Sequence, residues 1–161
     1  MTRVYLSLGS NIEPEKNLRA ALAELRTRFG EIAVSPTYRY AAVGFNGPDF
    51  LNLAVGLDTD LPPQLLNDWL HVLEDRHGRR RDLPRFSSRT LDADIVLYGD
   101  QVLAGEGNLQ IPRPELEYAF VLKPLTDIAA DVVHPLLHKT LLELWCESPE
   151  YPDPVQVVTD P

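Results

Sequence analysis

The residues whose types and spacing point most directly to chemistry are two aspartates, Asp92 and Asp94, in the run Thr90-Leu91-Asp92-Ala93-Asp94-Ile95. Alternating polar and apolar residues predict a strand, on which residues two apart point to the same face. Neighbouring carboxylates repel each other, and a divalent cation between them removes the repulsion. Mg²⁺ suits hard oxygen ligands and often combines one or two carboxylates with substrate phosphates. Alone, Asp-x-Asp fits a solvent-facing strand better.

An arginine-rich segment directly before the aspartates favours the metal interpretation. Six of the fifteen Lys and Arg residues lie between Arg76 and Arg89, although the net charge of the whole chain is −9. Guanidinium groups grip phosphate oxygens through a planar fork of donors. We therefore expect the segment to hold a small polyanion, with a solvated charged loop as the alternative. Glu74 precedes it, and position alone favours a surface location for this residue.

The segment 50–57 contains a second candidate binding face. Phe50 and Asn52 share one side of the predicted strand, and Leu51 and Leu53 share the other. An aromatic ring beside an amide, which both donates and accepts hydrogen bonds, suits a flat heterocycle. Taken alone, a half-exposed strand packed under another element fits this pattern slightly better. The glycine-containing loop 41–49 leads directly into the strand, where it could close over such a ligand.

These candidates lie in a chain of 161 residues, a length that predicts one domain. The chain is 44% apolar and 24% charged, which is typical of a soluble globular protein. Its single cysteine, Cys146, excludes an internal disulfide framework. Neither a membrane span nor a signal peptide is expected, so we predict a cytoplasmic location. The acidic net charge argues against binding to nucleic acid or to anionic membranes.

The elements that must position these residues follow a recognisable order. Strands are expected at 4–8, 32–40, 50–57 and 90–98, and long helices at 14–29 and 62–77. The order strand-helix-strand-strand-helix-strand is the split βαβ pattern, which predicts a mainly antiparallel sheet with both helices on one face. Opposite the two aspartates, the core-facing side of the last strand is expected to carry Leu91, Ala93, Ile95 and Leu97.

The C-terminal third is expected to add smaller elements. A short strand at 101–103 and short helices at 115–119, 120–129 and 139–145 fit the sequence. Residues 149–161 hold four prolines and read as a loosely held tail, which leaves one domain over residues 1–148.

Five motifs together resemble the 6-hydroxymethyl-7,8-dihydropterin pyrophosphokinases of folate biosynthesis. The resemblance runs from about residue 4 to residue 145. The motifs are Leu8-Gly9-Ser10-Asn11, Asp49-Phe50-Leu51-Asn52, Glu74 with Gly78-Arg79, Arg89-Thr90-Leu91-Asp92-Ala93-Asp94-Ile95, and Phe120-Val121-Leu122 followed by Pro124-Leu125.

The resemblance implies a ferredoxin-like α+β sandwich that transfers the β,γ-diphosphoryl group of ATP to the hydroxymethyl oxygen of the pterin, releasing AMP. Asp92 and Asp94 match the pair that binds two Mg²⁺ ions, and Arg79 and Arg89 match arginines that move in over the phosphates. ATP-site positions are expected at Glu74, Arg79, Arg81, Arg85, Arg89, Ile95, Arg113 and Tyr118. Pterin-site positions are expected at Tyr40, Ala41, Ala42, Val43, Phe50, Asn52, Phe86 and Phe120. A monomer is expected.

Two residues depart from the family pattern. Arg113 stands where the family commonly has His, and Tyr118 where it commonly has Arg. Both family residues contact ATP phosphates. Either the retained cation at 113 compensates for the lost one at 118, or the chain is a catalytically weak paralogue that serves as a nucleotide- or pterin-binding module.

Overall fold

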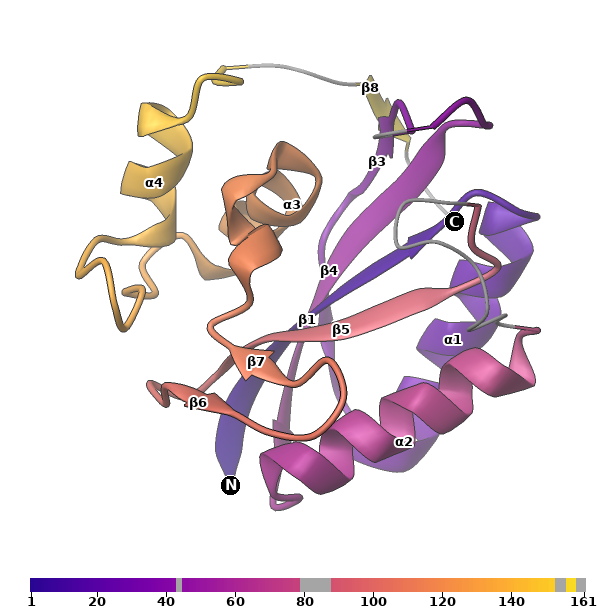
Figure 1. Cartoon of the computed structure of the whole chain (residues 1–161), viewed down its shortest axis with the longest axis horizontal. Helices are drawn as coiled ribbons and strands as arrows, with labels where there is room; N and C mark the ends of the chain where they lie inside the picture. Colours follow the sequence, from indigo (N-terminus) through magenta and orange to yellow (C-terminus); the bar gives the residue numbers. More distant parts are fainter. Residues whose placement is uncertain (43–44, 79–87, 153–155, 159–161) are drawn as a thin grey trace.

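The computed structural model describes residues 1–42, 45–78, 88–152 and 156–158 (Figure 1). The elements in chain order are β1 (Thr2–Ser10), α1 (Pro14–Phe29), β2 (Ala33–Val34), β3 (Thr37–Tyr40), β4 (Phe50–Thr59), α2 (Pro63–Arg76), β5 (Asp92–Tyr98), β6 (Leu103–Ala104), β7 (Gln110–Ile111), the 3-10 helix η1 (Pro114–Glu117), α3 (Ala119–Ala129), α4 (Leu141–Glu147) and β8 (Gln156–Val158).

One antiparallel sheet organises the molecule. Its strand order is β5-β1-β4-β3-β8, and β2 also pairs with β4. The order of elements and the antiparallel pairing confirm the predicted α+β class. Strand β8 lies within the expected proline-rich tail, and it pairs with β3 so that Val157 is opposite Tyr38. The fold therefore extends to residue 158 along this edge of the sheet.

Two separate cores lie on the two faces of the sheet. Helices α1 and α2 cover one face, as predicted, and helices α3 and α4 lie on the other (Figure 1). Leu8, Leu53 and Ile95 belong to the first core with both long helices, whereas Ala54 and Trp145 belong to the second. Apolar residues recur at every second position on a strand and about every 3.6 residues on a helix. Each element therefore has one apolar face, and the strands and helices pack these faces against each other.

A β-bulge in β5 corrects one predicted strand face. Leu6 pairs with Ile95 but Tyr5 pairs with Leu97, so Val96 is an extra residue on β5. Val96 and Leu97 consequently pack in the core under α3, whereas Ala93 and Ile95 pack under α2. The expectation that Leu97 shares the face of Ala93 is therefore wrong. Asp92 and Asp94 precede the bulge and keep the predicted common face.

A buried histidine holds together the connection between α3 and α4. His134 is 7% exposed, and its Nδ1 accepts hydrogen bonds from the backbone N–H groups of Leu136 and Leu137 at 3.1 and 3.2 Å. Burial of the ring and the nearby His138 lower the pKa of His134. Protonation would remove the Nδ1 acceptor on which this turn depends.

We therefore expect the contribution of His134 to stability to be lost as the pH falls below about 6.5, the usual pKa of histidine in an unfolded chain. Below that pH the unfolded state binds the proton more readily, so the free energy of unfolding decreases until the lower folded pKa is passed. Urea unfolding at pH 7.5 and pH 5.0 measures this loss. In His134→Asn, whose Oδ1 can accept the same bonds without titrating, the loss should be smaller. Equal losses in both proteins would exclude His134 as the cause.

Candidate active site

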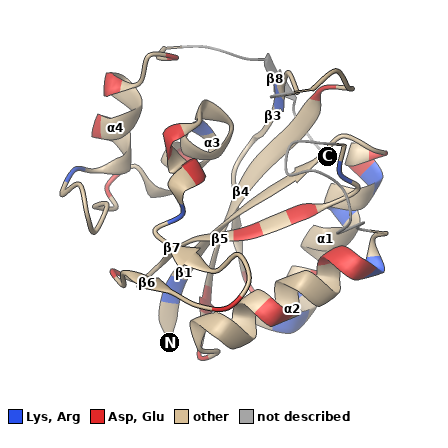
Figure 2. Cartoon of the chain, viewed as in Figure 1, with Lys and Arg blue, Asp and Glu red and all other residues tan. Residues whose placement is uncertain are grey.

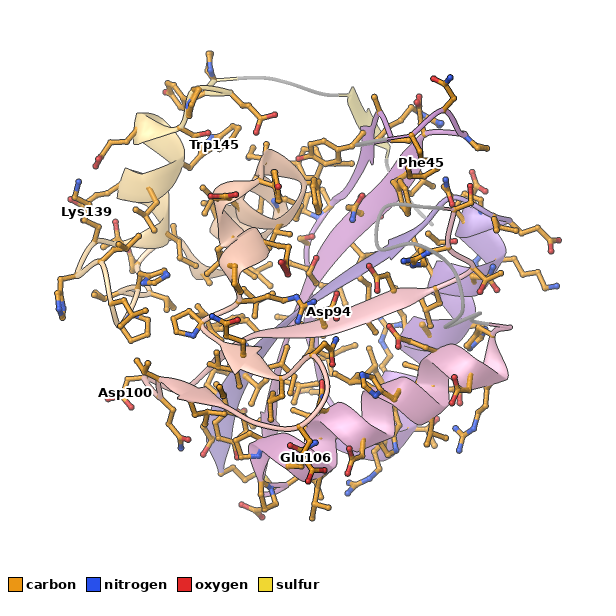
Figure 3. All side chains as sticks on the ribbon, viewed as in Figure 1. Phe45, Asp94, Asp100, Glu106, Lys139 and Trp145 are labelled. Carbon is orange, nitrogen blue, oxygen red and sulfur yellow. The ribbon has the colours of Figure 1, made fainter. Side chains whose placement is uncertain are left out.

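Three carboxylates meet at the outer edge of β5. Glu74, Asp92 and Asp94 each offer an oxygen, and these oxygens lie within 4.8 Å of one another. Figure 2 marks the acidic positions on β5 and near the end of α2, and Figure 3 labels Asp94 beside the strand. We call these three residues the acid cluster. Their proximity agrees with the predicted pairing of Asp92 and Asp94 on one face.

Glu74 reaches the acid cluster from the opposite layer because β5 is an edge strand. Helix α2 packs its leucines under the sheet, but Glu74 in its last turn extends to the sheet edge. There its Oε2 accepts a hydrogen bond from the backbone N–H of Ala93 at 2.8 Å. Glu74 is 2% exposed, so the surface location inferred from its position alone is wrong. The ATP-site position that the family resemblance implies for Glu74 stays a prediction.

The charge of the acid cluster favours a bound cation. Burial raises the pKa of Asp94 well above its usual range, and the charge of Asp92 raises it further, while Arg113 acts in the opposite direction. A divalent cation would supply the charge that this site lacks and bring the pKa of Asp94 down again. Three clustered carboxylate oxygens are also the hard donor set that Mg²⁺ prefers. The residues present therefore fit a magnesium site.

Arg113 lies against the acid cluster rather than in solvent. Its Nη2 is 3.4 Å from Oδ1 of Asp94, and its Nε is 2.6 Å from Oε2 of Glu115. Its Nη1 donates to the backbone oxygen of Asn108 at 3.1 Å, and the Asn108 side chain donates to the same Asp94 oxygen at 3.2 Å. Neither Asn108 nor Glu115 was predicted from the sequence, because only the folding of the β6–β7 hairpin and of η1 against β5 brings them here.

A row of residues across four strands connects the acid cluster with the second candidate face. Asp92 on β5 is opposite Gly9 on β1, Gly9 is opposite Asn52 on β4, and Asn52 is opposite Tyr38 on β3. Asn52 is 6% exposed, and its Oδ1 has no hydrogen-bond partner among the described residues. A buried amide oxygen without a partner is costly, which favours a ligand that donates to it.

Gly9 leaves the space that the Asn52 side chain occupies. A Cβ built at residue 9 would lie 2.6 Å from Nδ2 of Asn52, closer than real Cβ atoms come. We therefore expect Gly9→Ala to displace the amide and to weaken binding of the pterin that the family resemblance implies tenfold or more, while nucleotide affinity changes little. Isothermal titration with each ligand measures both. Unchanged pterin affinity would show that the amide need not occupy this position.

Hydrogen bonds from β3 fix α3 beside this row. The hydroxyl of Tyr40 donates to the backbone oxygen of Ala119 at 2.9 Å. The hydroxyl of Tyr38 donates to Oδ2 of Asp127 at 2.5 Å, and Lys123 donates to the other oxygen of the same carboxylate at 2.7 Å. The bond to Ala119 sets the position of the first turn of α3, which carries Phe120, and the bond to Asp127 holds a later turn.

The aromatic residues form two groups near Asn52. Phe50, on the same face as Asn52, meets Phe45 edge to face with ring centroids 6.4 Å apart. Phe120 meets Tyr40 edge to face at 6.1 Å and stacks on Tyr118 at 5.2 Å with an interplanar angle of 11°. Tyr118, expected beside ATP phosphates, thus has its ring against an expected pterin-site residue. Phe45, labelled in Figure 3, was not predicted from the sequence.

Asn11 connects the loops around the site. Its backbone N–H donates to the oxygen of Arg89 at 3.0 Å, and its Oδ1 accepts from the N–H of Arg89 at 2.8 Å. Its Nδ2 donates to the oxygen of Pro48 at 3.0 Å and to Oγ of Ser88 at 3.3 Å. Arg89, itself 6% exposed, is thereby fixed between β1 and the loop that precedes β4.

The remaining predicted positions divide into two groups. Ala41 and Ala42 follow β3 directly. The side chain of Ile95 packs in the core, so only the backbone of Ile95 is available to a nucleotide. The other predicted positions lie outside the described residues. They are Val43, Arg79, Arg81, Arg85 and Phe86.

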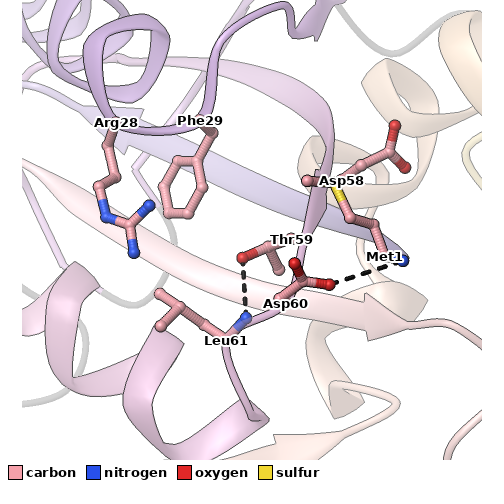
Figure 4. A pocket seen from close by; sticks show the side chains of 7 residues that line it. All are labelled: Met1, Arg28, Phe29, Asp58, Thr59, Asp60 and Leu61. Carbon is pink, nitrogen blue, oxygen red and sulfur yellow. Dashed lines mark hydrogen bonds and ion pairs between the residues drawn. The ribbon is translucent and has the colours of Figure 1, made fainter.

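A cavity of about 300 Å³ lies at the other end of the sheet (Figure 4). Its lining includes Met1 and Asp60, whose amino group and carboxylate lie 3.6 Å apart, and the cation Arg28. Thr59, at the end of β4, is opposite Thr2, whereas the acid cluster lies near Gly9 at the other end of β1. The cavity is thus separate from the candidate active site.

A family model identifies the family to which the chain belongs. The model of 7,8-dihydro-6-hydroxymethylpterin-pyrophosphokinase matches residues 5–130. The chain belongs to this family. Pyrophosphokinases of the family are also among its sequence relatives. The chain is 41% identical over 143 residues to the 2-amino-4-hydroxy-6-hydroxymethyldihydropteridine pyrophosphokinase of Synechocystis sp., covering 86% of this chain and 72% of the relative. It is 43% identical over 137 residues to that of Pseudomonas aeruginosa, covering 81% and 82%.

Solved structures support the fold of the pyrophosphokinase. A Plasmodium falciparum HPPK-DHPS structure matches with a TM-score of 0.70 at 15% identity, covering 91% of this chain and 41% of the other. The complex of an HPPK-DHPS with substrates matches with a TM-score of 0.69 at 14% identity, covering 91% and 42%. The chain therefore spans less than half of these longer proteins. The expected ferredoxin-like α+β sandwich is confirmed.

Membership of the family also confirms the expected activity class. The chain is an ATP-dependent pyrophosphokinase of folate biosynthesis, as its named relatives are. Neither the family match nor the named relatives support the alternative of a weak paralogue that only binds. None of the described helices is long and apolar enough to cross a membrane.

Proposed function

We propose that the acid cluster binds ATP through two Mg²⁺ ions and that the face bearing Phe50 and Asn52 binds 6-hydroxymethyl-7,8-dihydropterin. The observation that carries this proposal is the cross-strand row from Asp92 through Gly9 to Asn52. Adjacent strands are about 4.8 Å apart, so the two side chains are anchored on strands roughly 10 Å apart. A pterin ring at Asn52 would place its hydroxymethyl arm toward the phosphates at the acid cluster.

The proposed residue roles follow from the demands of phosphoryl transfer. The pterin oxygen attacks the β-phosphorus, and the bond from that phosphorus to the oxygen retained by AMP breaks. Such transfer depends on in-line positioning and charge neutralisation. Bound Mg²⁺ would neutralise the polyphosphate and orient it. Asp92 and Asp94, with Glu74 beside them, would hold the Mg²⁺ ions at the phosphate end of the site. The phosphates themselves would be contacted by four arginines, Arg79, Arg81, Arg85 and Arg89.

The pterin is proposed to be recognised by stacking and by the Asn52 amide. The free Oδ1 of Asn52 would accept from the amino edge of the ring, and Phe50 and Phe120 would cover its faces. Tyr40, Ala41, Ala42, Val43 and Phe86 complete the proposed pterin site. The contact of Tyr118 with Phe120 supports an aromatic role for Tyr118 as well as contact with the nucleotide.

We further propose that residues 1–148 form a single pyrophosphokinase domain, to whose sheet the tail adds β8, and that the chain acts as a cytoplasmic monomer. Size-exclusion chromatography with light scattering would test the monomer.

A product assay with ATP, Mg²⁺ and 6-hydroxymethyl-7,8-dihydropterin tests the function. We expect AMP and pterin diphosphate in equal amounts. ADP in place of AMP would overturn the proposed transfer. Absence of both products, with Mg²⁺-dependent ATP binding retained, would favour the binding-module alternative.

A further inference from the structure

Arg113 contacts the acid cluster at an atom that a metal ion would also need. Its Nη2 lies 3.4 Å from Oδ1 of Asp94, while Nε and Nη1 are engaged by Glu115 and by the backbone of Asn108. Both charged partners are largely buried, with side chains 17% exposed at Arg113 and 13% at Asp94. Low exposure limits screening by solvent, so the attraction is stronger than between surface charges.

A cation that approaches Asp94 must therefore compete with a guanidinium already there. Oδ1 of Asp94 accepts in addition from Nδ2 of Asn108 at 3.2 Å, and Asn108 is itself held by Asn67 and His71 at 3.2 and 2.9 Å. These contacts keep Oδ1 pointing at Arg113. A metal ion can bind this oxygen only if these polar contacts are lost, and their loss makes the free energy of metal binding less favourable.

We propose that Arg113 is a resident cation that suppresses metal binding at the acid cluster until a nucleotide draws it away. This inference rests on the proposed function of the cluster. The anchor on Glu115 leaves Nη2 free to exchange Asp94 for a phosphate oxygen, a partner that guanidinium binds well. Nucleotide binding then frees Asp94 for the metal, and the two ligands bind with positive coupling.

Titration with Mn²⁺, a paramagnetic substitute for Mg²⁺, tests this without any turnover. Free Mn²⁺ is followed by electron paramagnetic resonance for the whole chain, without nucleotide and with a non-hydrolysable ATP analogue. We expect Arg113→Gln to bind Mn²⁺ alone about tenfold more tightly than the unaltered protein, within the usual range of coupling. The gain in Mn²⁺ affinity that the analogue brings should shrink correspondingly.

Two further variants make the comparison specific. Arg3→Gln removes the same charge at the other end of β1, where Arg3 contacts Asp58, and should leave Mn²⁺ affinity unchanged. Arg113→Lys keeps the positive charge, so its Mn²⁺ affinity should be closer to that of the unaltered protein than the Mn²⁺ affinity of Arg113→Gln is. Thermal unfolding verifies that each variant is folded.

The outcomes separate this inference from the proposed function. Equal Mn²⁺ affinity in the unaltered protein and Arg113→Gln, both enhanced by the nucleotide analogue, overturns the inference and leaves the metal–nucleotide site intact. Equal tightening in Arg3→Gln and Arg113→Gln also overturns it, because net charge would then explain the effect. Absence of Mn²⁺ binding in all proteins, even with the analogue, overturns the proposed site itself.

Discussion

Replacing Asp94 with Asn is expected to lower kcat by about a thousandfold while the protein stays folded, and Asp92→Asn should behave similarly. Removing one preorganised electrostatic contact to a transition state typically costs 10² to 10³ in rate, and a lost metal ligand disturbs the remaining contacts too. The rate of AMP release under saturating substrates measures the effect. Rates near that of the unaltered protein in either variant would contradict the assignment of these carboxylates.

The same substitution should stabilise the metal-free protein at neutral pH. Burial and Asp92 raise the folded pKa of Asp94. The folded state therefore loses stability as the pH rises from about 4, the unfolded pKa, through the higher folded value. Asp94→Asn removes that loss, so its thermal midpoint at pH 7.5 should exceed that of the unaltered protein. Asp58→Asn, at the distant end of β4, is the control and should change neither the midpoint nor the rate.

Asn52→Ala is expected to weaken pterin binding roughly a hundredfold and to leave the affinity for an ATP analogue within about twofold. Loss of a buried hydrogen bond leaves the polar group of the ligand unsatisfied, which costs about 1–3 kcal/mol of binding free energy. Calorimetric titration of each ligand provides the comparison, with the nucleotide as the internal control. Similar losses for both ligands would mean that the change disturbs the sheet rather than the pterin face.

Periodic features of this fold were predictable because each follows from local spacing. The alternation in 50–57 placed Leu51 and Leu53 in the core and Asn52 on the other face, as the structure confirms. The bulge at Val96 was not predictable, since one extra residue in an entirely apolar stretch leaves the pattern unchanged. Leu97 was consequently assigned to the wrong face.

Features of the site that depend on tertiary contacts were harder to predict. The burial of Glu74 requires that β5 be an edge strand with a backbone N–H left to donate, which no local pattern reveals. Asn11 reads as a turn residue by type, yet it joins segments 37 and 78 residues away. The family resemblance implied an ATP-site position for Glu74, and in the structure Glu74 lies beside Asp92 and Asp94.

The edge position of β5 has a consequence for solubility. An open strand edge offers unpaired backbone groups to other chains and invites edge-to-edge association. Here the carboxylate of Glu74 accepts a hydrogen bond from the N–H of Ala93. The backbone N–H of Arg113 donates to the oxygen of Val96 at 3.0 Å. The charges of Asp92 and Asp94 lie along the same strand. Residues of the proposed active site thus also cover this strand edge, and replacing the three carboxylates together with uncharged, apolar residues is expected to favour edge-to-edge association.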